Sequence, residues 1–331
     1  MRSSSVTAQR VPRQGSTTGS SPRRCTRSAL LTPGLAGHPL YSVVAAYLRS
    51  HIGPRLVDSV DGLSTSAVFN AAASMLELAG WMAHDRGEDR TAHVHFRRAL
   101  EFTTLGDDSH LCAHVLGSMS HLAAHDGRPH ETIQLARQGQ DVLRTRAPHP
   151  PLTARLLALE ARGVAGLGER TRPLNLLAHA EAELAKGGPS EQPPSPWVNH
   201  YDQASLASDT GRCLYRLGDL AGTRRQAEHI IALRPPQRAR SHGLGQLTLA
   251  KVFVAQGALD EASAVVEQAL SPSLPVHSAP IAQGLRTLHD TLRPHRSNAA
   301  VAQIHTRLTA TLQRGGDLPG HRRPACTGTG T

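Results

Sequence analysis

Two pairs of histidines are the residues of this sequence whose type and spacing could most directly do chemistry. His110 and His114, and likewise His121 and His125, are four residues apart, so each pair would share one helix face. Imidazoles on a shared face can bind zinc, but a catalytic zinc site also needs a third ligand and a general base. The segment from His121 to His125 lacks the glutamate of the H-E-x-x-H motif. Since chance pairs are expected among 20 histidines, we predict no metal site and no cofactor.

Other catalytic signatures are also missing from the sequence. It contains no P-loop, no G-x-G-x-x-G motif after a strand-like segment, no G-x-S-x-G and no protein-kinase signature. The four cysteines form no C-x-x-C pair, which argues against a disulfide framework or a zinc cluster. We therefore expect that the protein is not an enzyme.

The histidines belong to a pattern of paired helices, which is clearest between Leu76 and Leu100. An apolar stripe of leucine and alanine ends near Gly87, and a second stripe follows it. The spacing predicts two helices joined by a tight turn. Small residues at Gly80 and Ala92 would let the two helices approach closely, because larger side chains there would overpack the contact.

Five glycines mark further turns of this kind. Gly87, Gly127, Gly168, Gly218 and Gly257 are separated by 40, 41, 50 and 39 residues, and helical periodicity precedes and follows each. A sixth pair is predicted at 278–292 and 298–312, and 187–196 has the composition of a loop. No segment alternates like a strand, so the sequence predicts an all-α fold, an α-solenoid of about five to six helical hairpins. A helix at 38–59 would cap the first repeat, and the run Ser64-Thr65-Ser66 offers N-caps for the next helix.

Two runs of residues resemble a known family. The run Leu78-Ala79-Gly80-Trp81-Met82-Ala83-His84-Asp85-x-Gly87 and the run His114-Val115-Leu116-Gly117-Ser118-Met119-Ser120-His121 are similar to tetratricopeptide (TPR) repeats. More narrowly, they resemble the C-terminal sensor half of actinobacterial Xre-type (helix-turn-helix) transcriptional regulators. The resemblance covers about 40–313 and implies a right-handed superhelix. It also implies an N-terminal DNA-binding domain, but only 37 residues precede the first predicted helix, so the helix-turn-helix is missing or the start is misassigned.

The first helices of stacked hairpins line the concave side of a solenoid. Counting back from each turn glycine gives the large polar and aromatic side chains that would face this groove. Its arginines suit carboxylates or phosphates, whereas the alternative is a solvated helix face. Trp81 could equally belong to the core. The predicted groove residues are Glu77, Trp81, His84, Asp85, His121, His125, Arg155, Arg162, Arg212, Tyr215, Arg216 and Lys251.

The net charge of +10 is concentrated at the ends of the chain. Residues 1–37 carry six arginines and no acid, and 314–331 are basic and rich in glycine. We predict that both are disordered tails flanking a repeat domain at 38–313. Basic tails without aromatics give little sequence readout, so we expect no direct nucleic-acid binding without an added domain. No apolar run could span a membrane and no secretion signal is recognisable, so we expect a cytoplasmic protein.

The leading hypothesis is a non-enzymatic regulatory or protein-interaction module. It would bind a peptide, a protein partner or a small effector in the His/Arg-lined groove, in transcriptional or developmental regulation. The partner would be acidic if the arginines bind it. The alternative is a DNA-binding regulator of Xre type whose DNA-binding domain is truncated or supplied by a partner.

Overall fold

The computed structural model describes residues 38–52, 62–146, 148–186, 197–198 and 200–316. The chain divides into two units, 1–32 and 33–331, and every described residue belongs to the second. Within the described residues all regular elements are helices, and no strand occurs. Helix α1 (His38–Tyr47) leads into a π-helical turn, Leu48–Ile52.

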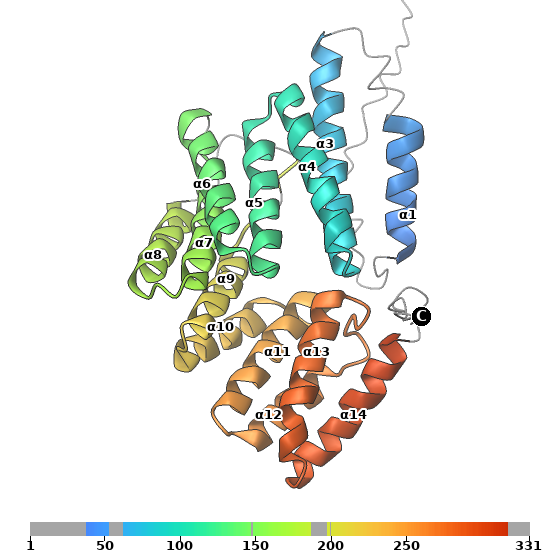
Figure 1. Cartoon of the computed structure of the whole chain (residues 1–331), viewed down its shortest axis with the longest axis vertical. Coiled ribbons are helices and arrows are strands. Elements are labelled where there is room, and N and C mark those ends of the chain that lie inside the picture. The colour runs from blue at the N-terminus through green and yellow to red at the C-terminus, as the bar shows by residue number, and fades with distance from the viewer. Residues whose placement is uncertain (1–37, 53–61, 147, 187–196, 199, 317–331) are drawn as a thin grey trace, which may run out of the picture. The chain divides into compact units, whose positions relative to one another are not determined.

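Six helical hairpins follow α1 in the described part of the chain (Figure 1). The sixth contains a 3₁₀ turn, Arg293–His295, between its helices. The hairpins are α3 (Gly62–Asp85) with α4 (Asp89–Gly106), α5 (Ser109–His125) with α6 (Pro129–Arg146), α7 (Pro150–Gly166) with α8 (Thr171–Lys186), α9 (Gln203–Arg216) with α10 (Leu220–Leu233), α11 (Ala239–Ala255) with α12 (Leu259–Ala269), and α13 (Ala279–Leu292) with α14 (Ala299–Gly316).

The five predicted turn glycines all adopt the left-handed conformation. Their φ angles are 77° at Gly87, 72° at Gly127, 86° at Gly168, 80° at Gly218 and 76° at Gly257. After Gly87 the backbone N–H of Glu88 donates to the carbonyl of Ala83 at 2.9 Å, the 6→1 bond of a Schellman cap. A Cβ would strain this conformation, which explains why glycine recurs there. The prediction of five glycine turns is confirmed.

Close packing between α3 and α4 depends on Gly80. A Cβ added at Gly80 would lie 2.4 Å from Cε1 of Phe96, whose side chain is fully buried. Ala92 is also fully buried, and Trp81 packs edge-on against the Phe96 ring with 5.5 Å between centroids. The predicted close approach of the two helices is therefore confirmed.

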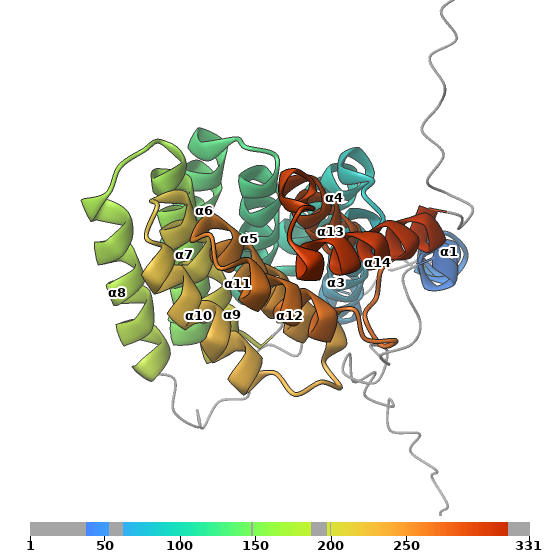
Figure 2. The same cartoon turned by 90° about the horizontal axis from the view of Figure 1, so that it is seen from below.

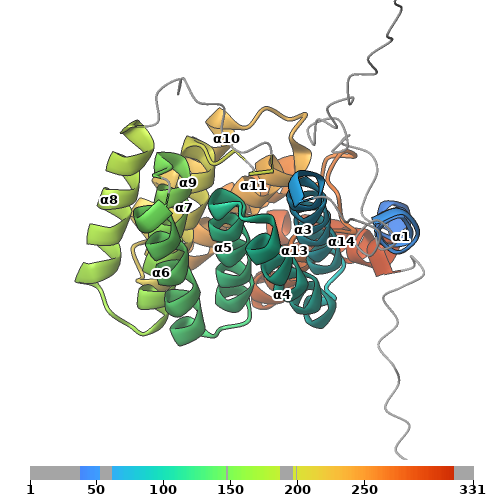
Figure 3. The same cartoon turned by 90° about the horizontal axis from the view of Figure 1, so that it is seen from above.

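Most successive hairpins contact each other through their first helices, and the second helix of a hairpin also packs against the first helix of the next, as α4 does against α5, α6 against α7 and α10 against α11. Helix α3 contacts α5, α5 contacts α7, α7 contacts α9, and α11 contacts α13 (Figures 2 and 3). Side chains one repeat apart form hydrogen bonds between these first helices. Each of the three pairs is separated by 41 residues of sequence: Ser118 with Glu77, Arg155 with His114, and Arg162 with His121. We call the side chains that these first helices present to one another and to solvent the first-helix face.

A longer-range contact links the first hairpin to the fifth and sixth. Helix α13 contacts α3, and Arg240 at the start of α11 forms an ion pair with Asp85 at the end of α3, with 2.7 Å between Nη2 and Oδ1. The hydroxyl of Ser278, just before α13, donates to the same carboxylate oxygen at 3.4 Å. Nearest-neighbour stacking does not predict these contacts.

Some predicted boundaries need correction. Ser64 to Ser66 lie inside α3, which begins at Gly62, so they do not cap it. The Ser66 hydroxyl instead donates to the carbonyl of Gly106 at 2.6 Å, at the end of α4. Helix α14 continues to Gly316, past the predicted helix end at 312 and the predicted domain end at 313. The predicted loop at 187–196 and the tails at 1–37 and 317–331 lie outside the described residues, as does the end of the capping helix at 53–59.

Candidate functional site

Trp81 lies at the edge of the core, beside a buried polar network. Its indole N–H donates to Oε1 of Glu77 at 2.6 Å, and the Ser118 hydroxyl donates to the same oxygen at 2.9 Å. Glu77 is fully buried between α3 and α5, so the prediction that it lines an accessible groove is wrong. Trp81 is half-buried and contacts both Phe96 of the core and His121 of the first-helix face. Both interpretations of Trp81 therefore describe part of its surroundings.

The two predicted histidine pairs do not act as pairs. The ring of His110 lies 5.1 Å from that of His149, whereas His114 accepts a hydrogen bond from Arg155 at 2.8 Å. Nδ1 of His121 lies 3.1 Å from Nη1 of Arg162, whereas His125 faces Asp89. Helix periodicity places each pair on one face, but neighbouring helices give the two members different partners.

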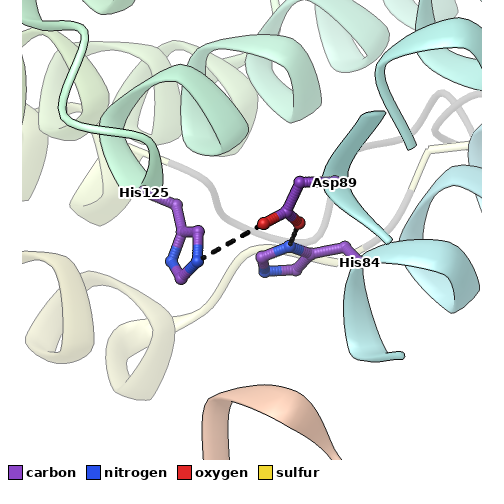
Figure 4. Close-up of side chains that lie close together, drawn as sticks. All are labelled: His84, Asp89 and His125. Atoms are coloured by element: carbon purple, nitrogen blue, oxygen red, sulfur yellow. Dashed lines mark hydrogen bonds and ion pairs between the residues drawn. The ribbon is translucent and has the colours of Figure 1, made fainter. Parts of the chain in front are cut away.

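His84, Asp89 and His125 come together where the first two hairpins meet (Figure 4). His84 ends α3, Asp89 begins α4, and His125 ends α5. Nδ1 of His84 lies 2.7 Å from Oδ1 of Asp89, and Nε2 of His125 lies 3.8 Å from Oδ2. The sequence predicted both histidines but not Asp89, which lies after the turn glycine, on the second helix of its hairpin.

Asp209 in α9 holds the central arginines in place. Nη1 of Arg162 lies 3.1 Å from Oδ1 of Asp209, and the Tyr201 hydroxyl donates to Oδ2 at 3.1 Å. The side chains of Arg162 and Asp209 are only 10% and 9% exposed. Burial, followed by the Asp209 carboxylate, raises the pKa of Tyr201 well above its usual value. The buried ion pair thus fixes Arg162 on the first-helix face.

Positive charge accumulates next to this pair. The Arg212 side chain is 41% exposed and reaches Oδ1 of Asp209 only at 3.5 Å. Nevertheless, burial and then the nearby Arg162 lower the pKa of Arg212 to about 10. Burial and then Arg212 also lower the pKa of the half-buried Lys251.

His121 lies between the histidines and the arginines. Burial is the main cause that lowers its pKa well below the usual value, and the charges of Arg162 and Arg212 add to the effect. His121 is therefore neutral at pH 7 and can accept the hydrogen bond from Arg162. The ring also packs edge-on against Trp81, with 5.1 Å between centroids.

The remaining predicted residues lie at the ends of this surface. Asp85 pairs with Arg240, which sequence reasoning missed because Arg240 lies at the start of α11, outside the positions counted back from Gly257. Tyr215 and Arg216, at the end of α9, are exposed. Asp209 was also missed, although its position three residues before Arg212 on the same helix is a signal for an ion pair.

Comparisons with known proteins agree with this architecture. No family model matches the sequence, and no curated protein matches it. A solved structure of a Rap protein complexed with competence and sporulation factor is similar to this structure, with a TM-score of 0.53 and 12% sequence identity. The match covers 84% of this chain and 87% of that chain. The chain is a TPR-like α-solenoid. Within its described part, no helix has both the length and the apolar character needed to cross a membrane.

Proposed function

We propose that this protein is a non-enzymatic regulatory protein whose first-helix face binds an acidic peptide, protein partner or small effector. The observation that carries the proposal is the excess of positive charge around Arg212 and Lys251. Their lowered pKa values mean that the surroundings disfavour the charged forms. The charged neighbour that lowers the pKa of Lys251 is itself a cation, Arg212, so an anionic group of a ligand would supply the opposite charge.

The arrangement suits recognition of a carboxylate or phosphate. Asp209 fixes Arg162 from one side, while the partly exposed Arg212 keeps donors available for a ligand. A hydrogen bond between charged groups is worth about 1.5–3 kcal/mol, and a bidentate pair adds orientation. Trp81 and His121 would supply an aromatic edge next to the charged region.

The likeness to the Rap protein supports the proposed role. That protein is complexed with competence and sporulation factor, so a chain of this fold holds another molecule. The regulatory context rests on the resemblance of 78–87 and 114–121 to the sensor half of Xre-type regulators. We place the protein in the cytoplasm, in transcriptional or developmental regulation.

The test is co-purification with mass spectrometry, in which the charges of Arg212 and Lys251 are reversed by substitution with glutamate. Arg212→Glu/Lys251→Glu alters accessible groups, whereas Arg162 is avoided because its loss would leave Asp209 buried without its partner. Arg144→Glu is the matched control, since that side chain is 73% exposed on α6. We expect the wild type and the control to retain a bound species that the double variant loses, with equal helix content by circular dichroism. Retention of the same species by the double variant would refute the assignment.

The DNA-binding alternative makes a different prediction. A gel-shift assay of the full chain would show sequence-specific complexes that persist as salt is raised if this chain reads DNA itself. We expect only weak, salt-sensitive binding.

A further inference from the structure

The cluster of His84, Asp89 and His125 offers three metal-binding atoms from three helices. All three atoms lie within 4.8 Å of one another. The two oxygens of one carboxylate face the two imidazoles, at 2.7 Å for His84 and 3.8 Å for His125 (Figure 4). We propose that these residues bind a divalent transition-metal ion of the zinc type, and that the ion links the first hairpin to the second.

The distances are close to those of a real site. Zinc binds imidazole nitrogen and carboxylate oxygen at about 2.0–2.2 Å, so neighbouring ligand atoms in a tetrahedral site are about 3.4 Å apart. The observed separations, 2.7 Å from His84 to Oδ1 and 3.8 Å from His125 to Oδ2, differ from that value by about 0.7 Å and 0.4 Å. His84 is held by burial, whereas the side chains of His125 and Asp89 are 43% and 31% exposed and can make the adjustment of about 0.4–0.7 Å.

A hydrogen-bonded cluster without an ion explains only part of this geometry. The contact between His84 and Asp89 is a good hydrogen bond by itself. The contact between His125 and Asp89 at 3.8 Å is too long for one, although the nitrogen and oxygen face each other. The two rings meet nearly at right angles with 4.8 Å between centroids, so their nitrogens approach the carboxylate from different directions.

The ligand types select the class of ion. Two imidazoles and one carboxylate suit zinc, cobalt, nickel or ferrous iron, whereas magnesium and calcium prefer oxygen ligands. Three protein ligands leave a coordination position for water or for an anionic group of a bound molecule. His84 and His125 lie on first helices, but neither Arg212 nor Lys251 contributes a ligand, so failure of the metal site and failure of the proposed function can be told apart.

The experiment titrates Zn²⁺ into the chelator-treated full chain, followed by calorimetry and thermal unfolding, with Mg²⁺ as the metal control. His125→Ala and Asp89→Asn remove a ligand; the second keeps the size of the side chain and an oxygen that can accept from His84. His229→Ala is the matched control, since His229 is exposed on α10, away from the cluster.

We expect the wild type and His229→Ala to bind one tight equivalent of Zn²⁺, with a raised midpoint of thermal unfolding and no response to Mg²⁺. Both ligand variants should weaken that equivalent by at least about tenfold, since even indirect partners of metal ligands are worth 10–100-fold. The inference is overturned if Zn²⁺ binds the ligand variants and the wild type equally, or if the wild type shows only weak binding.

Discussion

Replacing Gly80 with alanine tests the packing of the first hairpin. In a helix, alanine is favoured over glycine by about 1 kcal/mol when nothing obstructs the new methyl group. At Gly80 the methyl carbon would lie 2.4 Å from Cε1 and 2.6 Å from Cδ1 of Phe96, whereas carbon atoms in contact prefer about 3.5–4.0 Å. The ring is buried beneath Trp81 and has little freedom to turn away.

The clash should outweigh the gain in helix propensity. Overpacking a core costs about 1–3 kcal/mol, and subtracting the gain of about 1 kcal/mol leaves an expected decrease in the free energy of unfolding of up to about 2 kcal/mol for Gly80→Ala. Gly211 is the matched control, because a Cβ there would meet its nearest neighbour, Cβ of Gln226, at an ordinary 3.4 Å. Gly211→Ala should therefore raise the free energy of unfolding by up to about 1 kcal/mol.

The assay is urea unfolding followed by circular dichroism, and the cause is tested by a double variant. Phe96→Leu removes the obstructing ring, so Gly80→Ala should cost less in that background than in the wild type. If Gly80→Ala stabilises the chain as much as Gly211→Ala does, the two helices do not pack as closely as described.

Three further predictions concern other parts of the chain. Burial alone would raise the pKa of Asp202, but hydrogen bonds from Arg234 and Ser205 outweigh it and lower the value to about 2. The folded state therefore gains stability that is complete above pH 3.8 and is lost as the pH falls through 2. Arg234→Gln should lower the free energy of unfolding by about 1–2 kcal/mol at pH 7, by about half of that near pH 3 and by little near pH 2 in urea titrations. Gly127→Ala should cost about 1–2 kcal/mol in the same assay, because φ is 72° and nothing within 4 Å obstructs the methyl group, so any cost reports on the backbone. Burial raises the pKa of the Cys213 thiol to about 12, so a thiol reagent at pH 8 should modify Cys213 only when the chain unfolds; rapid modification of the folded chain would contradict its burial.

The hairpins could be predicted from the sequence because their causes are local. Apolar periodicity sets the helices, and the left-handed turns need glycine at five positions. The boundaries were less predictable, since Ser66 could cap a helix but binds the end of α4 instead. A local signal cannot show which of two possible partners a hydroxyl will find.

The candidate site was predictable only in part. Counting back from the turn glycines identified Arg162 and Arg212 as groove residues. Arg162 and His121 occupy equivalent positions in neighbouring repeats, 41 residues apart, so their contact could also have been predicted. Asp209 meets Arg162 across 47 residues, which is not one of those shifts. The approach of Asp89 to His125 depends on how one hairpin is tilted against the next, and the sequence carries no simple signal for that tilt.

The ion pair between Asp85 and Arg240 has a consequence for how the chain folds. Its partners are 155 residues apart, and Ser278 reaches Asp85 across 193 residues. An array held only by neighbouring repeats can fray from one end at little cost to the other. Contacts that close such a long loop instead couple the two ends, and they form late because the entropy of closure must be overcome first. Loss of the first hairpin should therefore loosen the fifth and sixth, so that distant repeats exchange their amide protons cooperatively.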